Sequence, residues 1–261
     1  MNLLSIIIPY YNRRDILLNT LSSINLFSGD YPIETIVVDD GSDIGEWVDC
    51  AVDMFPKLNI NLIYLRRPKA VWRGPTIAYN MGFNEAKGDV IFLNGVDCMH
   101  CGDLVGYVFR HMKENMYMNF SAYRGTNNIN EVLKTFDWYD TAEMESLKGS
   151  FDLTRAENWH IHSKFFYELA PFCAAINRSD MERLGGMDER FEQGVGYEDS
   201  DFTDRVKNLG LNAVMVDEPF CLHQRHKFTD YTNPTNRKLL YQLRADAPQR
   251  IKATQNKIYI R

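Results

Sequence analysis

Two apolar runs that each end in a polar cluster constrain the fold of this chain more than any other feature. Residues 3–9 lead into Tyr10-Tyr11-Asn12-Arg13, and residues 36–38 lead into Asp39-Asp40-Gly41-Ser42. Both runs are β-branched and apolar, as buried parallel strands are. Ligands bind beyond the carboxyl ends of the strands in open α/β sheets, so we expect both clusters to face one crevice. The alternative is that Asp39-Asp40-Gly41-Ser42 only forms a turn and caps the next helix.

Composition excludes several classes of protein. A length of 261 residues suffices for one large core, or for one core with an inserted lobe. The net charge of −6 argues against nucleic acid as the main partner, because phosphate binding needs a basic face. No apolar stretch approaches the ~20 residues that span a bilayer, and residues 1–9 lack the basic start and cleavage site of a signal peptide. The five cysteines, an odd number, favour a reducing cytoplasm over a disulfide framework.

The segment 231–261 differs from the rest of the chain in charge, because it holds seven Lys or Arg residues and one acidic residue. Such a basic tail is typical of a solvated helix. It also suits contact with an anionic membrane surface or an acidic partner. We therefore expect a cytoplasmic protein, which lies at the inner face of the membrane if the tail binds there.

The first hundred residues alternate between strand and helix patterns with short connections. Strands are expected at 3–9, 33–38, 60–65 and 90–93, and helices at 13–27, 44–54 and 75–86. This rhythm predicts an α/β fold with a mostly parallel sheet flanked by helices. The stretch 117–171 loses the rhythm, which is typical of a lid or binding insertion. Within the same domain, order is expected to return with a strand at 172–177, helices at 179–184 and 199–209, and a strand at 213–216.

A third polar cluster, Asn94-Gly95-Val96-Asp97, follows the strand expected at 90–93. An acidic side chain directly past a strand end, beside the other two clusters, is suited to hold a divalent cation. The same residues also suit a plainer structure, in which Asn94-Gly95 is a turn and Asp97 caps a following helix.

A fourth segment places acids after a glycine loop. Glu198 and Asp199 lie at the start of the helix expected at 199–209, where acids also serve the helix dipole. The preceding Gly194 and Gly196 let the backbone approach a ligand closely, so a carboxylate held there could act as a general base.

Two histidines, His223 and His226, follow a strand-like run downstream of these acids. They form either a surface pair or a source of neutral imidazole, which is a common metal ligand.

Taken in order, these segments resemble a family-two, GT-A-type glycosyltransferase that uses a nucleotide sugar. The segments that carry the resemblance are IIPYYNR, VVDDGS, Arg73 with Asn80-Met81-Gly82-Phe83, FLNGVDC, and GGMDERF followed by GYEDSDF. The second half is similar to the C-terminal segment of β-1,4-galactosyltransferases and chondroitin-type polymerases. The resemblance implies a single GT-A, Rossmann-like domain over 1–230 with an irregular acceptor-side insertion. Its nucleotide-sugar half is 1–116, its acceptor and catalytic-base half is 117–230, and 231–261 is the basic tail.

The resemblance assigns one group of residues to binding of a UDP-sugar donor. They are Pro9, Tyr10 and Arg13 for the uracil and ribose, Asp39 with Asp40 for the uridine, and Arg73 for the diphosphate.

The resemblance also assigns metal-binding and catalytic roles. Asp97 matches the last acid of the metal-binding DxD motif, and His223 matches the later histidine that completes the metal site, with His226 as the alternate. Asp199 matches the catalytic base, and Glu198 matches an acid that contacts the acceptor. Oxygen and nitrogen ligands beside a diphosphate favour Mn²⁺, with Mg²⁺ as the second choice.

Two departures from the family pattern affect these sites. Gly95-Val96-Asp97 stands where the family has Asp-x-Asp, and we expect Asn94 to replace the contact of the missing acid without its charge. The tryptophan that usually precedes the Glu-Asp pair is also absent. Tyr197 or Trp159 is therefore expected to form the acceptor platform.

The resemblance implies metal-dependent, inverting transfer of a hexose or N-acetylhexosamine from a UDP-sugar to a hydroxyl of a glycan or glycolipid. Synthesis of a bacterial surface polysaccharide is the implied setting. The missing acid favours an alternative, a non-catalytic module that binds nucleotide sugars or glycans. Nucleotidyltransferases and dinucleotide-dependent oxidoreductases fit less well, because Tyr10-Tyr11-Asn12-Arg13 is not a Gly-rich phosphate loop and no GxGxxG follows a strand.

Overall fold

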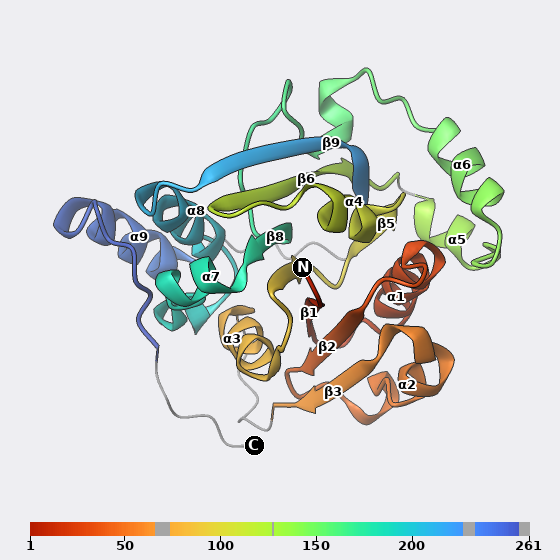
Figure 1. The fold of residues 1–261 in the computed structure, drawn as a ribbon, viewed down its shortest axis with the longest axis horizontal. Coiled ribbons are helices and arrows are strands. Elements are labelled where there is room, and N and C mark those ends of the chain that lie inside the picture. Colours follow the sequence, from red (N-terminus) through yellow and green to blue (C-terminus); the bar gives the residue numbers. More distant parts are fainter. Residues whose placement is uncertain (66–73, 127, 227–232, 256–261) are drawn as a thin grey trace.

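A computed structural model of the chain describes residues 1–65, 74–126, 128–226 and 233–255. In these residues a nine-stranded sheet runs through the molecule, with helices on both of its faces (Figure 1). The strand order is β3-β2-β1-β4-β8-β6-β9-β5, and β7 pairs with β6 outside this path. Across the described ranges, no helix is both long and apolar enough to cross a membrane.

The first four strands along the chain form the parallel part of the sheet. They are β1 Leu4–Tyr10, β2 Ile33–Asp39, β3 Ile60–Tyr64 and β4 Val90–Asn94. β1 lies between β2 and β4, and its register pairs Tyr10 with Asp39. The first two polar clusters therefore lie side by side at the carboxyl edge of the sheet, as the sequence predicts.

Antiparallel pairing begins at β8, Cys173–Asn177, which lies between β4 and β6, Met116–Arg124. β6 is parallel to β9, Asn212–His223, and β9 is antiparallel to β5, Cys98–Cys101. The short strand β7, Trp159–Ile161, pairs with the C-terminal part of β6.

β6 corrects the expectation that the stretch 117–171 lacks regular structure. Eight of its nine residues are buried, so neither face shows the alternation that marks a half-exposed strand. Its polar residues are satisfied inside the protein: Asn119 Nδ2 donates to the carbonyl oxygens of Ala170 and Cys173, at 2.8 and 3.3 Å. Polar composition therefore concealed a central strand.

Helices cover the sheet from two sides. One face carries α1 Arg14–Phe27, α2 Cys50–Met54 and α4 Leu104–His111, and the other carries α3 Thr76–Glu85, α7 Arg178–Leu184 and α8 Glu198–Asn208. β1 serves both cores, because Ile6 and Ile8 pack with the first group and Ile7 with the second. Full burial of one such side chain is worth about 1.5–3 kcal/mol.

Two details of the predicted helices differ in the structure. The helix expected at 44–54 is divided into a 3₁₀ turn, η1 Ile44–Glu46, and α2, and a second 3₁₀ turn, η2 Pro56–Leu58, precedes β3. Asp97 does not cap a helix, because β5 follows it. The cap of α4 is Asp103, whose side chain accepts from the Gly106 N–H.

A third core lies under the insertion between β6 and β8, drawn in green in Figure 1. It is covered by α5 Ile129–Leu133, α6 Thr141–Gly149 and the 3₁₀ turn η3 Ala156–Asn158. Trp159, Tyr123 and Phe220 pack together at its centre, with Trp159 ring centroids 5.2 and 5.3 Å from the other two.

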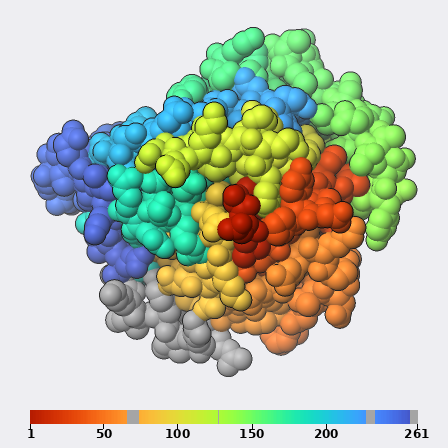
Figure 2. Space-filling view, in the orientation of Figure 1, coloured from red at the N-terminus to blue at the C-terminus, as the bar shows by residue number. Residues whose placement is uncertain are grey.

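The C-terminal part of the chain packs against the second half of the molecule. Figure 2 shows its blue surface continuing into the teal surface of α7. α9, Pro234–Asp246, buries Asn236 and Leu240, and the Ala253 N–H donates to the carbonyl of Leu184 at 2.8 Å. The basic tail was expected as a solvated helix, and most of α9 is exposed to solvent, while Asn236 and Leu240 anchor it to the rest of the protein.

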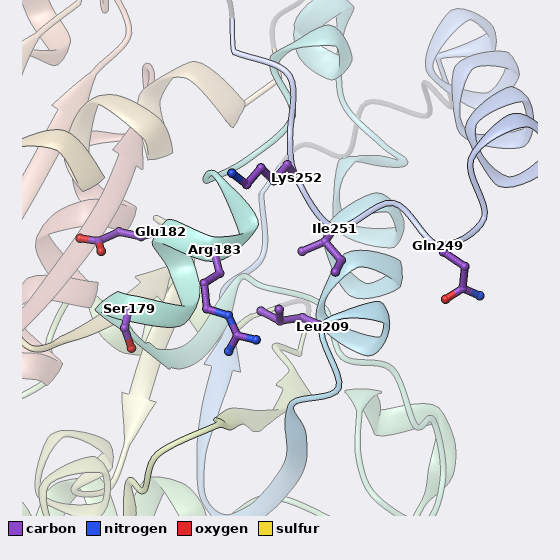
Figure 3. Close-up of a pocket in the computed structure, with 7 residues that line it drawn as sticks. All are labelled: Ser179, Glu182, Arg183, Leu209, Gln249, Ile251 and Lys252. Carbon is purple, nitrogen blue, oxygen red and sulfur yellow. The ribbon is translucent and has the colours of Figure 1, made fainter.

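Figure 3 shows how the segment after α9 lies beside α7 and the end of α8. A hollow of about 660 Å³ separates them at the surface. Its lining residues are Ser179, Glu182, Arg183, Leu209, Gln249, Ile251 and Lys252.

Candidate active site

Asp97 lies at the centre of a polar cluster beyond the ends of β4 and β9. Its Oδ2 is 2.9 Å from Arg13 Nη1 and 3.0 Å from His226 Nε2, and its Oδ1 is 3.7 Å from His223 Nε2. Ligand atoms of Asp97, His223 and His226 all lie within 4.8 Å of one another. The structure thus brings together the two residues that the resemblance assigns to a metal, Asp97 and His223, and the alternate, His226.

Strand pairing explains why residues so distant in sequence meet. The register of β5 and β9 sets His223 opposite the residue that follows Asp97, and the Gln224 N–H donates to the Asp97 carbonyl at 2.8 Å. Gln224 is fully buried, and its Nε2 donates to Thr20 Oγ1 on α1 at 2.9 Å. The Gln224 side chain therefore fastens the segment between the two histidines to α1.

The charges around Asp97 keep its carboxyl ionised. Burial alone would raise the pKa of Asp97, but the two histidines, when protonated at low pH, and the Arg13 guanidinium hold it well below its usual range. Burial lowers the pKa of His223, so its imidazole is neutral at pH 7 and can act as a ligand. With His223 neutral, Arg13 supplies the positive charge that compensates Asp97.

The donor set of this cluster fits a divalent cation. One carboxylate and two imidazoles within 4.8 Å match the mixed oxygen and nitrogen ligands of Mn²⁺ sites. A side chain at Gly95 would crowd this arrangement, since a Cβ there would lie 3.1 Å from Asp97 Oδ1. His226 offers a third ligand atom beside those of Asp97 and His223.

Asp39 presents an unused carboxylate oxygen at the carboxyl end of β2. The residue is fully buried, and its Oδ1 accepts from the Ser42 N–H at 2.7 Å. Its Oδ2 has no hydrogen-bond partner among the described residues. Burial raises the pKa of Asp39. A hydrogen-bond donor at Oδ2 would stabilise its charged form.

The other predicted donor residues lie around the end of β1. Tyr10 is buried and its hydroxyl donates to the Glu46 carbonyl, while the Asp40 N–H donates to the Tyr10 carbonyl at 2.8 Å. Pro9 is partly exposed beside them. Arg73, the predicted diphosphate contact, lies outside the described residues.

Asn94 supports the turn that carries Asp97. It is fully buried, and its Nδ2 donates to the carbonyls of Gly95 and Cys98 at 2.9 and 3.1 Å. Its Oδ1 is 3.0 Å from His100 Nε2, on β5. Because both ends of this amide are used inside the protein, the geometry argues against the donor contact predicted for Asn94.

The predicted acids lie in the first turn of α8. Glu198 is buried, and its Oε2 has no hydrogen-bond partner among the described residues. Burial and then the Asp199 charge raise the pKa of Glu198, and burial and then Glu168 raise that of Asp199. A carboxyl with a raised pKa is a better proton acceptor near neutral pH than an ordinary aspartate.

The charges of Asp199 and Asp97 both reach one side chain, Tyr79 on α3. Burial, followed by Cys98, Asp199 and Asp97, raises the pKa of Tyr79 well above its usual value. Acids from the two halves of the chain therefore both influence one buried residue.

Of the two aromatic residues predicted to contact the acceptor, Tyr197 is partly exposed and Trp159 is buried. Tyr197 lies directly before α8 with a left-handed backbone, φ 74°, and is partly exposed. Trp159 is only 2% exposed, and its Nε1 donates to the Leu153 carbonyl at 3.1 Å. Its burial in the third core argues against the platform role predicted for Trp159. Phe166 and Tyr167 are the exposed aromatics that precede Glu168.

His160 was not among the predicted site residues. Its ring centroid is 4.5 Å from that of His223, and burial, followed by His223, lowers the pKa of His160 to about 3. The sequence signal was weak, because His160 lies in the insertion, far along the chain from every recognised motif. Only the pairing of β7 with β6 places it beside the cluster.

Comparison with known proteins adds a family assignment to this geometry. Residues 5–185 match the family described as "Glycosyl transferase family 2", and residues 155–229 match "N-terminal domain of galactosyltransferase". The first match covers more than half of the chain.

Two curated relatives come from Bacillus subtilis (strain 168). "Uncharacterized glycosyltransferase YfnE" is 23% identical over 282 residues, which cover 93% of this chain and 68% of the relative. "Probable glycosyltransferase YdaM" is 26% identical over 214 residues, 80% of this chain and 47% of the relative. The chain thus spans between about half and two thirds of their length.

Solved structures share the fold at low sequence identity. The S. aureus TarS fragment 1-349 in complex with UDP-GlcNAc aligns with a TM-score of 0.62 and 15% identity, over 97% of this chain and 68% of that one. The mannosyltransferase PcManGT from Pyrobaculum calidifontis, in complex with GDP-Man and Mn²⁺, gives 0.54 and 22% over 86% and 57%.

The ordered motifs, the sheet with its polar carboxyl edge and the match over residues 5–185 lead to one assignment. This chain is a glycosyltransferase and belongs to glycosyl transferase family 2.

Proposed function

We propose that this enzyme transfers a hexose or N-acetylhexosamine from a UDP-sugar to a glycan or glycolipid hydroxyl, with inversion at the anomeric carbon. The observation that carries the proposal is the convergence of Asp97, His223 and His226 beyond the same sheet edge that bears Asp39. The related structures with bound UDP-GlcNAc and GDP-Man support a nucleotide-sugar donor.

The donor would lie along the carboxyl edge of β1, β2 and β4. The buried Asp39 Oδ2, without a partner among the described residues, is placed to accept from the N–H of a uracil. Arg13 contacts Asp97 and would direct its guanidinium to the diphosphate of the donor. Both contacts would hold the donor with its sugar near the second half of the chain.

Asp97, His223 and His226 would hold a divalent cation, with Mn²⁺ preferred over Mg²⁺. When bound, the cation supplies positive charge beside the diphosphate leaving group. The Mn²⁺ in the related mannosyltransferase complex supports this cofactor.

Asp199 would accept the proton of the acceptor hydroxyl, which attacks the anomeric carbon opposite the leaving diphosphate. The raised pKa of Asp199 suits this role, and Glu198 beside it would accept hydrogen bonds from acceptor hydroxyls. One base with attack opposite the leaving group predicts inversion. The setting that we propose is bacterial surface polysaccharide synthesis in the cytoplasm, with membrane contact through the basic residues of 231–261.

The alternative is a non-catalytic module that binds nucleotide sugars. Gly95 at the position of the first DxD acid is the observation in its favour. The presence of His226 beside Asp97 weighs against it, because the cluster still offers three ligand atoms.

Asp199→Asn tests the proposed reaction. UDP release from a panel of UDP-sugars with Mn²⁺ and glycan acceptors is measured for the wild type and the variant. We expect the variant to lose about 10²-fold or more in transfer rate, because the amide cannot take a proton. Its affinity for UDP with Mn²⁺, measured by calorimetry, should stay within about twofold.

The matched control is Asp204→Asn, on the same helix but in an exposed ion pair with Arg244. It should transfer at the wild-type rate. Full turnover by Asp199→Asn would remove that residue from the role of base. Failure of the wild type to release UDP from any donor, with binding retained, would favour the non-catalytic alternative.

A further inference from the structure

Asn236, on α9, contacts the loop that precedes the predicted base. It is fully buried, and its Nδ2 lies 2.9, 3.1 and 3.0 Å from the carbonyl oxygens of Phe191, Gly194 and Gly196. One amide nitrogen from the C-terminal helix therefore gathers three loop carbonyls.

The loop needs an external support because its own residues are permissive. Gly194 and Gly196 have φ values of +150° and +103°, which a glycine adopts at little cost. The same freedom leaves such a loop mobile unless something holds its carbonyls. Asn236 does so from α9, and Asn233, the cap of that helix, adds a bond from its Nδ2 to the Gln193 carbonyl.

A second set of contacts joins the segment after α9 to α8. Arg250 pairs with Asp201, one turn into α8, and with Asp188 at 2.8 Å. Both acids are buried, at 2% and 1% exposure, so these are interior ion pairs. The Thr254 N–H donates to the same Asp188 carboxylate at 3.2 Å.

We propose that α9 and residues 247–255 belong to the catalytic apparatus, and that Asn236 is a positioning residue that sets the place of Asp199. The inference rests on the proposed function in one respect, the role of Asp199 as base. The start of α8 is held on both sides: Asn236 fixes the backbone before it, and Arg250 fixes Asp201 within it. Displacement of this turn moves the base relative to the acceptor, where about 1 Å costs on the order of 10²-fold in rate.

The chemistry of position 236 follows from its surroundings. The two N–H groups of the amide, one of them shared, can serve the three carbonyl oxygens, whereas a carboxylate would be repelled by them. Asn236→Asp keeps the shape and reverses the contact, whereas Asn236→Ser keeps one hydrogen-bond donor. The two variants therefore separate the donor function of the side chain from its volume.

The experiment compares Asn236→Asp and Asn236→Ser with the matched control Asn177→Asp. Asn177 also donates its Nδ2 to a carbonyl, that of Lys113 at 2.8 Å, but lies at the opposite end of α7 from Gly185 and, among the described residues, makes no hydrogen bond to the loop. Turnover number, KM for donor and acceptor, and UDP affinity with Mn²⁺ are measured for each. Hydrogen exchange of amides 194–203 supplies a readout that needs no activity.

We expect Asn236→Asp to lower kcat at least tenfold, with the donor KM and UDP affinity within twofold, and to speed amide exchange in 194–203. Asn236→Ser should fall between it and the wild type, and Asn177→Asp should match the wild type. Unchanged kcat and unchanged exchange in Asn236→Asp would overturn the proposal. So would an equal loss of UDP affinity, because that indicates general destabilisation. If the wild type shows no transfer, the proposed function fails, and the exchange data alone still decide whether Asn236 holds the loop.

Discussion

At the scale of single residues, the contact between Arg13 and Asp97 has the clearest consequence. The guanidinium lies 2.9 Å from a carboxylate oxygen that a divalent cation would need. Arg13 therefore competes with the cation as long as no diphosphate draws it away. This competition predicts that nucleotide and cation bind together more readily than either binds alone.

Arg13→Gln is expected to strengthen Mn²⁺ binding in the absence of nucleotide. Removal of a partly exposed competing charge is worth on the order of 1 kcal/mol, or about fivefold in Kd. Calorimetric titration of Mn²⁺ without UDP measures the effect. Arg14→Gln, which removes the neighbouring charge without touching Asp97, is the control. An unchanged or weaker Mn²⁺ affinity in Arg13→Gln would contradict the competition.

The proposed role of Asp199 as the base predicts how the reaction depends on pH. A base works only when it is deprotonated, and burial raises the pKa of Asp199 above that of an ordinary aspartate, about 3.9. The turnover number should therefore rise with pH along an acid limb that lies at least one pH unit above that value. A profile of kcat at saturating donor and acceptor, from pH 5 to 9, measures it. A flat profile across this range would show that no group of raised pKa limits the reaction.

Residue types and their order made much of the site predictable. The resemblance assigned Asp97 and His223 to a metal, with His226 as the alternate, and all three meet in the structure. Asn94 was predicted to contact the donor and Trp159 the acceptor, yet both side chains are buried and bonded to other parts of the protein. The sequence shows which residues can bind a sugar or a metal, but burial depends on strands that pair much later in the chain.

At the scale of elements, α3 is seated on β1 through a glycine. A Cβ at Gly82 would lie 2.3 Å from Ile7 Cγ2, so no larger residue fits without movement of the strand or the helix. The motif Asn80-Met81-Gly82-Phe83 therefore has a packing role. The close approach brings Asn80 to η4, Glu189–Gln193, where its Nδ2 donates to Glu189 Oε1 at 2.7 Å.

Gly82→Ala is expected to destabilise the protein by about 1–2 kcal/mol. Overpacking of a core costs ~1–3 kcal/mol, and the better helix propensity of alanine offsets up to ~1 kcal/mol of that. Chemical denaturation measures the free energy of unfolding. Gly149→Ala, at the end of α6 with open space around its Cβ, should leave it unchanged or slightly higher. Equal stabilities of the two variants would show that α3 is not seated on β1 in this way.

The parallel strands were predictable because each is a short apolar run between turn signals. β6 was missed because it is covered on both faces and carries polar residues that bond internally. Its place in the sheet is set by β8 and β9, which come more than fifty residues later. Local patterns cannot report pairing at that distance.

At the scale of the whole molecule, the C-terminal part is joined to the rest of the protein by buried ion pairs. An interior network of ion pairs links α8, the cap of η4 and the segment after α9; its members are Arg205, Arg250, Asp188 and Asp201. The charge excess of 231–261 suggested a separate tail. Composition alone does not show that one of its basic residues, Arg250, pairs with buried acids.

Arg250→Met is expected to lower the free energy of unfolding by about 3 kcal/mol. Loss of one partner from a buried ion pair costs ~3–5 kcal/mol, and Arg205 and Arg190 still contact the two acids. Lys252→Met, two residues on and exposed, removes the same charge as a control. Denaturation curves of both variants check the prediction. A loss below about 0.5 kcal/mol in Arg250→Met would show that the network contributes no more to stability than a surface ion pair does.

Asn236 and Arg250 also impose an order on biosynthesis. During translation the donor half leaves the ribosome first and can fold as its strands emerge. The loop before α8 must then wait, since the two side chains that hold it are made some forty and fifty residues later. A ribosome stalled within that interval would carry a nascent chain that has the proposed nucleotide-binding strands but lacks the residues that hold the proposed base in place.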